Sequence, residues 1–113
     1  MFKVAVSPTY IYPVTVEFPG NSGKTEKRTF DAEFKRLNQA EVEEVYRRLS
    51  AGELSDDLLV KEVLYGWGKV FDDEGKPLDF NEDNLEILMQ VFPTRPATVK
   101  AFFDSISGAK AKN

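Results

Sequence analysis

The sequence contains no histidine and no cysteine. Without cysteine the chain can form neither disulfides nor a thiolate nucleophile, and without histidine it has no imidazole base. Zinc and other transition metals also lose their usual ligands, so a metal site would need oxygen ligands and would favour calcium or magnesium. These absences make an enzyme the less favoured class. We expect no cofactor and no metal.

Long apolar runs are missing as well. No run approaches the roughly 20 residues of a membrane-spanning helix, and the first nine residues lack the layout of a signal peptide. We therefore predict a cytoplasmic protein with no membrane partner. The formal charge is −4, from 15 basic and 19 acidic residues, which argues against a nucleic-acid partner.

The chain has enough apolar residues for one core. Its 113 residues are 42% hydrophobic and 30% charged, values typical of a globular protein and not of a disordered one. Two domains of this total length would each be marginally stable. We predict one domain over residues 1–108, followed by a flexible polar tail over residues 109–113.

Two segments near the start alternate apolar and polar residues, as half-buried strands do. They span residues 14–18 and 30–34, and the turn-forming stretch 19–26 between them predicts a hairpin with a loose loop. Apolar residues at every second position over 2–6 indicate a possible third strand. The first half of the chain therefore predicts a small antiparallel sheet.

From Asn38 onward the apolar period changes to that of helices. Asn38 with Glu41 matches a capping box, and Ser55 and Asn81 are typical N-caps. Together with the sheet, about four α-helices predict an α+β fold. The predicted helices begin at Asn38, Ser55 and Asn81 and, for the fourth, after Thr94 and Pro96.

Each predicted helix has an apolar face, and the first one also has charged residues spaced for i, i+4 ion pairs on its opposite face. Those pairs would join Glu43 to Arg47 and Glu44 to Arg48. The apolar faces comprise Val42, Val45, Tyr46 and Leu49; Leu59, Val60, Val63 and Leu64; Leu85, Leu88, Met89 and Phe92; and Val99, Phe102, Phe103 and Ile106.

Two motifs raise the question of a ligand site. Residues 20–25 end like a phosphate-binding loop, but the first glycine is missing and the segment lies between two strands. The acidic stretch 72–83 does not match an EF-hand, because Gly75 in the sixth position would require an acid at position 70, which is valine. We interpret the first as a hairpin loop and the second as a solvated turn.

The segment 65–80 is predicted to be extended, folding back on itself at an acidic turn with Gly75. Trp67 could be exposed as a partner hot spot, but its flanking glycines and apolar neighbours favour a core position. We expect a set of structural anchors in and after this segment. They are Trp67, Phe71, Leu78, Phe80 and Leu85.

The order and spacing of several short motifs resemble those of the tail assembly chaperones of long-tailed bacteriophages. The resemblance runs from the hairpin to the last helix, whereas residues 7–13 match no family pattern. The motifs are residues 30–37, the helix 38–49, Gly66-Trp67, Val70, Asp72, Gly75, Pro77, Leu78, Phe80 and Asn84-Leu85.

The resemblance implies a binding function without catalysis. Chaperones of this family bind the long tape-measure protein, keep it soluble, and help the tail tube protein to assemble around it. They act in the bacterial host cytoplasm and are absent from the mature virion. Self-association into rings or chains is compatible with coating a long client. As a hypothesis, the faces around Phe92, Phe102 and Phe103 contact the partner, although the phenylalanines of the last helix could equally complete the core.

Many members of the family exist in two lengths through a −1 ribosomal frameshift. Residues 111–113 can be encoded by a slippery heptamer, which makes a longer product a hypothesis that the nucleotide sequence would test. Two other classes remain open. One is a structural tail completion or minor tail protein that stays in the virion, and the other, disfavoured by the interspersed charges, is an acidic mimic of DNA.

Overall fold

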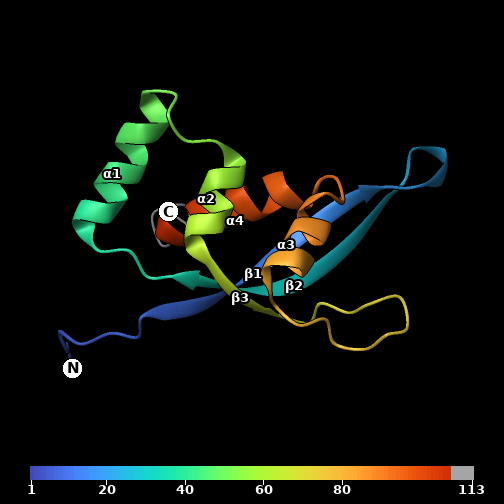
Figure 1. Cartoon of the computed structure of the whole chain (residues 1–113), viewed down its shortest axis with the longest axis horizontal. Coiled ribbons are helices and arrows are strands. Elements are labelled where there is room, and N and C mark those ends of the chain that lie inside the picture. Colours follow the sequence, from blue (N-terminus) through green and yellow to red (C-terminus); the bar gives the residue numbers. More distant parts are fainter. Residues whose placement is uncertain (108–113) are drawn as a thin grey trace.

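The computed structural model describes residues 1–107 as a three-stranded antiparallel sheet and four α-helices, which confirms the α+β prediction (Figure 1). The polar tail expected over 109–113 lies outside the described residues. The strands are β1 (Thr9–Pro19), β2 (Thr25–Lys35) and β3 (Leu64–Gly68), in the order β1-β2-β3, and the helices are α1 (Gln39–Ser50), α2 (Asp56–Val63), α3 (Glu82–Met89) and α4 (Thr94–Ser107).

The hairpin forms as the alternation predicts, and β1 pairs with β2 over their whole length. A short 3₁₀ turn, Asn21–Gly23, joins the strands, with Gly23 at a φ of 77° that favours glycine. The alternation buries one face of the sheet while the other stays open to solvent. The buried side chains are Val14, Val16, Phe30, Ala32 and Phe34.

The prediction of a strand over residues 2–6 is wrong. These residues pair with no strand of the described chain, and the third strand is instead β3, which follows α2 directly. Gly66 in β3 is buried, and a Cβ there would lie 2.6 Å from the Oε1 atom of Glu33. A larger residue at this position would therefore require the Glu33 side chain to move.

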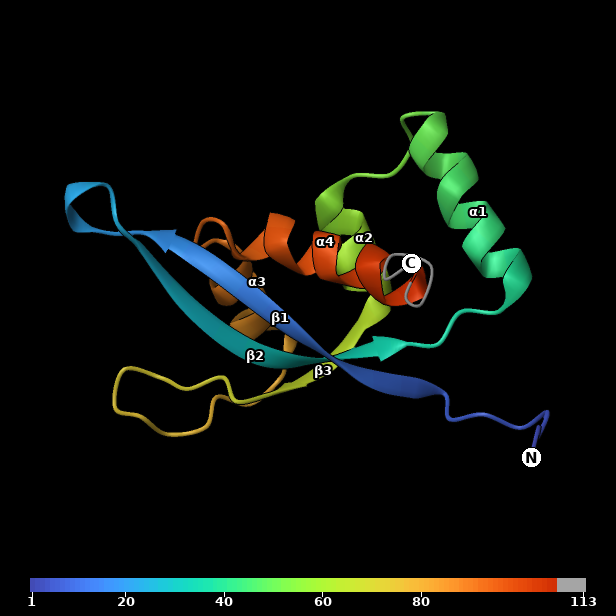
Figure 2. The ribbon, with the colours of Figure 1, turned by 180° about the vertical axis from the view of Figure 1, so that it is seen from behind.

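Helices α2 and α4 cover the buried face of the sheet (Figures 1 and 2). The ring of Phe34 in β2 meets Phe102 in α4 edge to face, with 5.4 Å between the ring centroids. The buried side of α2 consists, as predicted, of Leu59, Val60, Val63 and the adjoining Leu64.

The face that α4 buries differs from the predicted one. Thr98 is fully buried. Its hydroxyl donates a hydrogen bond to the Thr94 carbonyl one turn earlier, so the burial leaves this polar group with a partner. Small side chains on this face allow the helix to pack closely on the sheet. The buried residues are Thr94, Thr98, Ala101 and Phe102, whereas Val99, Phe103 and Ile106 are partly buried.

The three predicted N-caps are confirmed. Asn38 and Glu41 form the capping box, Ser55 accepts from the backbone N–H of Leu58, and Asn81 caps α3 in the same way. These contacts join residues three positions apart, so they can be read directly from the sequence.

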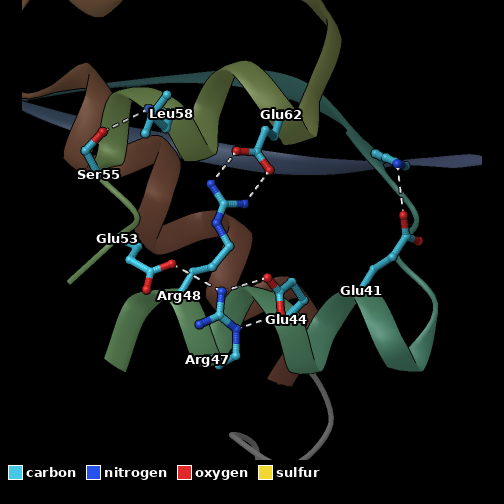
Figure 3. A network of polar contacts seen from close by, with 9 residues as sticks. Glu41, Glu44, Arg47, Arg48, Glu53, Ser55, Leu58 and Glu62 are labelled. Atoms are coloured by element: carbon cyan, nitrogen blue, oxygen red, sulfur yellow. Dashed lines mark hydrogen bonds and ion pairs between the residues drawn. The ribbon is translucent and has the colours of Figure 1, made fainter. Parts of the chain in front are cut away.

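Helix α1 stands away from the sheet and is held largely by polar contacts (Figures 1 and 3). Val45 is buried, whereas Tyr46 and Leu49 on the same predicted face are half exposed. Arg48 donates two hydrogen bonds to Glu62 of α2, 2.8 and 2.9 Å long. Lys35 pairs with Glu41 across the start of the helix at 3.1 Å.

The prediction of i, i+4 ion pairs on α1 is wrong. Arg47 binds Glu44, three residues earlier, and Glu53 beyond the helix end. Arg48 is used to join α1 to α2, a long-range contact that helical spacing does not show. Arg47 thus ties the last turns of α1 to one another and to Glu53, whereas Arg48 alone joins α1 to a distant helix (Figure 3).

The Phe34–Phe102 contact should dominate stability. We expect Phe102→Ala to lower the free energy of unfolding by about 3–5 kcal/mol, because it removes a fully buried ring and leaves a cavity. Phe71→Ala, at a side chain that is 58% exposed, should cost less than about 1 kcal/mol. Urea denaturation followed by circular dichroism measures both, and equal losses would contradict this packing.

The α1–α2 ion pair should make stability depend on pH. The hydrogen bonds from Arg48 lower the pKa of Glu62 below its ordinary value of 4.5. The stabilisation is therefore complete above that value and is lost as pH falls through the lower folded pKa. In thermal unfolding, Glu62→Gln should be less stable than wild type near neutral pH, and the two should converge as the pH falls below the lowered pKa of Glu62. A constant difference at every pH would contradict this assignment.

Candidate functional site

A largely apolar groove of about 780 Å³ lies at one end of the molecule. Its walls come from the hairpin next to its turn, the loop after β3, and α3, and we call it the α3 groove. Figures 1 and 2 show the hairpin turn and this loop projecting towards the same end. The apolar residues that line it are Val16, Phe18, Phe30, Val70, Phe71, Leu78, Ile87, Leu88 and Val91.

The loop wall of the groove is fastened to β3. The Nε1 atom of Trp67 donates a 2.7 Å hydrogen bond to the carbonyl of Leu78, and the Trp67 ring meets Phe80 edge to face at 4.9 Å. The backbone N–H of Leu78 donates to the Val70 carbonyl at 2.8 Å. The segment thus folds back on itself as predicted, which positions the groove wall.

The acidic turn at the tip of this loop has a structural role. The Oδ1 atom of Asp72 accepts hydrogen bonds from the backbone N–H groups of both Glu74 and Lys76, each 2.9 Å long. Gly75 has a φ of 78°, a conformation that favours glycine. Among residues 1–107, no three acidic side chains are grouped as metal ligands.

Four large apolar side chains in or beside the groove are open to solvent. The exposed fractions are 58% for Phe71, 62% for Ile87, 45% for Val91 and 73% for Phe92. Ile87 lines the groove from α3, Val91 lines it from just beyond the C-terminal end of that helix, and Phe92 follows directly. Exposed apolar side chains gathered around one groove, with charged residues beside them, are typical of a protein-binding site.

The basic residues of the groove are already paired. Arg28 contacts Glu26 at 3.3 Å and lies over the ring of Phe18, and Lys69 contacts Asp31 at 3.3 Å. The acidic turn 72–74 also lines the groove. The edge near that turn is therefore negatively charged.

The groove also contains one polar atom without a partner. Thr94, the first residue of α4, lines the groove and is 1% exposed, and its Oγ1 atom has no hydrogen-bond partner among residues 1–107. A buried hydroxyl without a hydrogen-bond partner lowers the stability of the fold, and a hydrogen bond from a bound group would offset this loss.

The structure separates the three predicted partner residues. Phe92 is exposed beside the α3 groove. Phe103 lies near the other end of α4, partly buried against Tyr46 of α1 with ring centroids 5.8 Å apart. Phe102 is 1% exposed and packs on Phe34, so the prediction that it lies on a partner surface is wrong. Its ring completes the core, the alternative that the sequence left open.

The predicted anchors also differ from one another. Leu85 is buried, and Trp67, Leu78 and Phe80 are partly buried against the core. The prediction that Phe71 is an anchor is wrong, because its side chain is exposed on the groove wall, whereas the neighbouring Val70 is buried. Ile87 and Val91 were missed as groove residues, although they lie four apart and outside the apolar face predicted for α3.

A second hollow, of about 470 Å³, lies between α1, α2 and the end of β2. Its charged residues pair with one another, as Arg48 with Glu62 and Lys35 with Glu41 show. These ion pairs join α1 to α2 and to the end of β2, so we interpret the hollow as part of the contact that holds α1 in place. In the described part of the chain, no helix is both long and apolar enough to cross a membrane.

Comparison with known proteins gives one family. No curated protein and no solved structure gives a significant match to this chain. The model of the family described as "Phage tail assembly chaperone" matches residues 1–113, which is the whole sequence given. The match agrees with the resemblance carried by the motifs of the hairpin, α1 and the Trp67 loop. The chain belongs to the phage tail assembly chaperone family.

Proposed function

We propose that this chaperone binds an apolar helical segment of the tape-measure protein in the α3 groove. By covering that segment it keeps the client soluble and lets the tail tube protein assemble around it. It acts by binding alone, in the bacterial host cytoplasm, and leaves before the virion is complete. The observation that carries the proposal is the row of exposed apolar side chains along the groove, Phe71, Ile87 and Val91.

The groove suits an amphipathic helix. Such a helix places apolar residues at i, i+3, i+4 and i+7 along one face, and a groove with walls on two sides receives that face. The loop with Phe71 forms one wall, and Ile87 of α3 with Val91 just past the end of that helix forms the other. The loop wall is rigidly held by Trp67, so the groove exists before the client arrives.

The strength of the contact is suited to release. Full burial of a large apolar side chain contributes about 1.5–3 kcal/mol, and the groove side chains are already roughly half covered. Three or four of them give an interaction of several kcal/mol, before the cost of association is subtracted. A chaperone that must leave its client needs this moderate, reversible binding.

The groove residues provide the first test. Ile87→Asp combined with Val91→Asp places two carboxylates where the client helix would pack, so capture of the tape-measure protein in co-expression pull-downs should fall at least about tenfold. Leu49→Asp on α1, at a similarly exposed apolar side chain, is the matched control and should bind as wild type. Circular dichroism confirms that each variant is folded. Undiminished capture by the groove variant would overturn the proposal.

Mature virions provide the second test. A chaperone that leaves before completion should be absent from purified particles when their proteins are identified by mass spectrometry, while it is present in lysates of infected cells. Stoichiometric retention in the particle would instead identify a structural tail completion or minor tail protein.

A further inference from the structure

Helix α4 has two buried threonines one turn apart, and their hydroxyl groups are in different states. Thr98 is fully buried, and its hydroxyl donates a 2.8 Å hydrogen bond to the carbonyl of Thr94. Thr94 is 1% exposed, and its own Oγ1 atom has no hydrogen-bond partner among residues 1–107. Because buried hydroxyl groups are nearly always hydrogen-bonded in folded proteins, the one at Thr94 needs an explanation.

The hydroxyl of Thr94 does not cap the helix. A threonine at the start of a helix usually accepts a hydrogen bond from the backbone N–H two or three residues later. Two residues after Thr94 stands Pro96, which has no N–H, and the N–H of Ala97 donates to the carbonyl of Pro93 at 3.1 Å. The backbone N–H of Thr94 itself donates to the carbonyl of Val91 at 2.8 Å. The start of α4 therefore leaves this hydroxyl as the group that a partner from outside the chain could satisfy.

Thr94 lines the α3 groove, and most of its neighbours in that lining are apolar. Val16 and Phe30 of the hairpin and Leu88 and Val91 line the same groove. The Oγ1 atom is covered in the free protein, so a bound group reaches it when a lining side chain turns aside. Val91 is 45% exposed, and exposed side chains change rotamer readily.

The groove favours a neutral amide as the partner of this hydroxyl. A hydroxyl both donates and accepts hydrogen bonds, and so does the amide of asparagine or glutamine. A carboxylate would be repelled by the acidic turn 72–74, and the basic residues of the groove, Arg28 and Lys69, are already paired. An ammonium buried against the apolar lining would lose its hydration at a high cost.

We infer that the α3 groove selects a client helix with one asparagine or glutamine within its apolar face, and that Thr94 forms a hydrogen bond with that amide. The inference rests on the proposed function, because it defines the class of client that the same groove accepts. Apolar walls alone would receive an amphipathic helix at several positions along its length. One buried polar pair specifies a single register, as a buried asparagine does in coiled coils.

The stability of the free protein tests the state of the hydroxyl. Valine has nearly the shape of threonine, so Thr94→Val removes a group that has no partner, and the melting temperature should stay the same or rise. Circular dichroism measures the melting temperature and also shows that the variant is folded. A clear fall would mean that the hydroxyl is bonded within the protein, and it would overturn the inference.

Two synthetic amphipathic peptides test the selection of the client. Both have leucine along one helical face and alanine and lysine elsewhere, and they differ at one central position of the apolar face, which is asparagine in one and leucine in the other. Fluorescence anisotropy gives the Kd of each peptide for the full chain. The ratio of the Kd of the asparagine peptide to that of the leucine peptide is compared between proteins, which cancels the general preference of the groove for apolar side chains.

Thr94→Val should raise this ratio at least about threefold over wild type, because the amide of the asparagine peptide loses its hydrogen-bond partner. Thr98→Val is the matched control, since it makes the same chemical change one turn along the helix at a hydroxyl that is already bonded. It should keep the wild-type ratio. A rise of less than about threefold in Thr94→Val, an equal rise in Thr98→Val, or a wild-type chain that binds neither peptide would overturn the inference.

Capture of the tape-measure protein by wild type and by the variant with Ile87→Asp and Val91→Asp is measured in parallel. If the peptide ratio does not change but capture depends on Ile87 and Val91, the inference fails and the proposed function stands. If the ratio changes as predicted but capture does not depend on these two residues, the proposed function fails and the selectivity of the groove stands.

Discussion

The packing of α4 on the hairpin is the contact on which the rest of the structure depends. Phe102 of α4 meets Phe34 of β2 at the centre of the buried face, and the threonines of the helix allow a close approach to the sheet. With α4 in place, α2 closes the core beside it, and Thr94 at the start of α4 lines the groove. The burial that makes the domain stable thus also positions the surface that we assign to the client.

Several large apolar side chains lie outside this core and are exposed to solvent. Phe71, Ile87 and Val91 stay exposed around a groove whose wall is held by the hydrogen bond from Trp67 to Leu78. Covering an apolar client requires no reactive side chain, so the absence of histidine and cysteine is compatible with this role. It needs a stable core, a charged exterior that keeps it soluble, and an apolar surface that a partner can cover.

The sequence predicts the local features of this fold well and its long-range ones poorly. The caps at Asn38, Ser55 and Asn81 depend on neighbours three residues away, and the alternation of the hairpin depends on one period. The segment 65–80 is predicted to be extended, but the pairing of β3 with β2 is not, because β3 is five residues long and contains two glycines. The buried face of α4 was misread because threonine counts as polar, although Thr98 satisfies its hydroxyl within the helix. The groove joins three distant segments, and no spacing along the chain shows such a meeting.

The central claim is that the client covers the α3 groove, and hydrogen–deuterium exchange tests it most directly. The full chain would be compared alone and with a soluble segment of the tape-measure protein. We predict that bound client slows exchange of backbone amides in residues 69–71 and 84–91, which form the two walls, and leaves those of α1 unchanged. Protection confined to α1, with no change along the groove walls, would contradict the account.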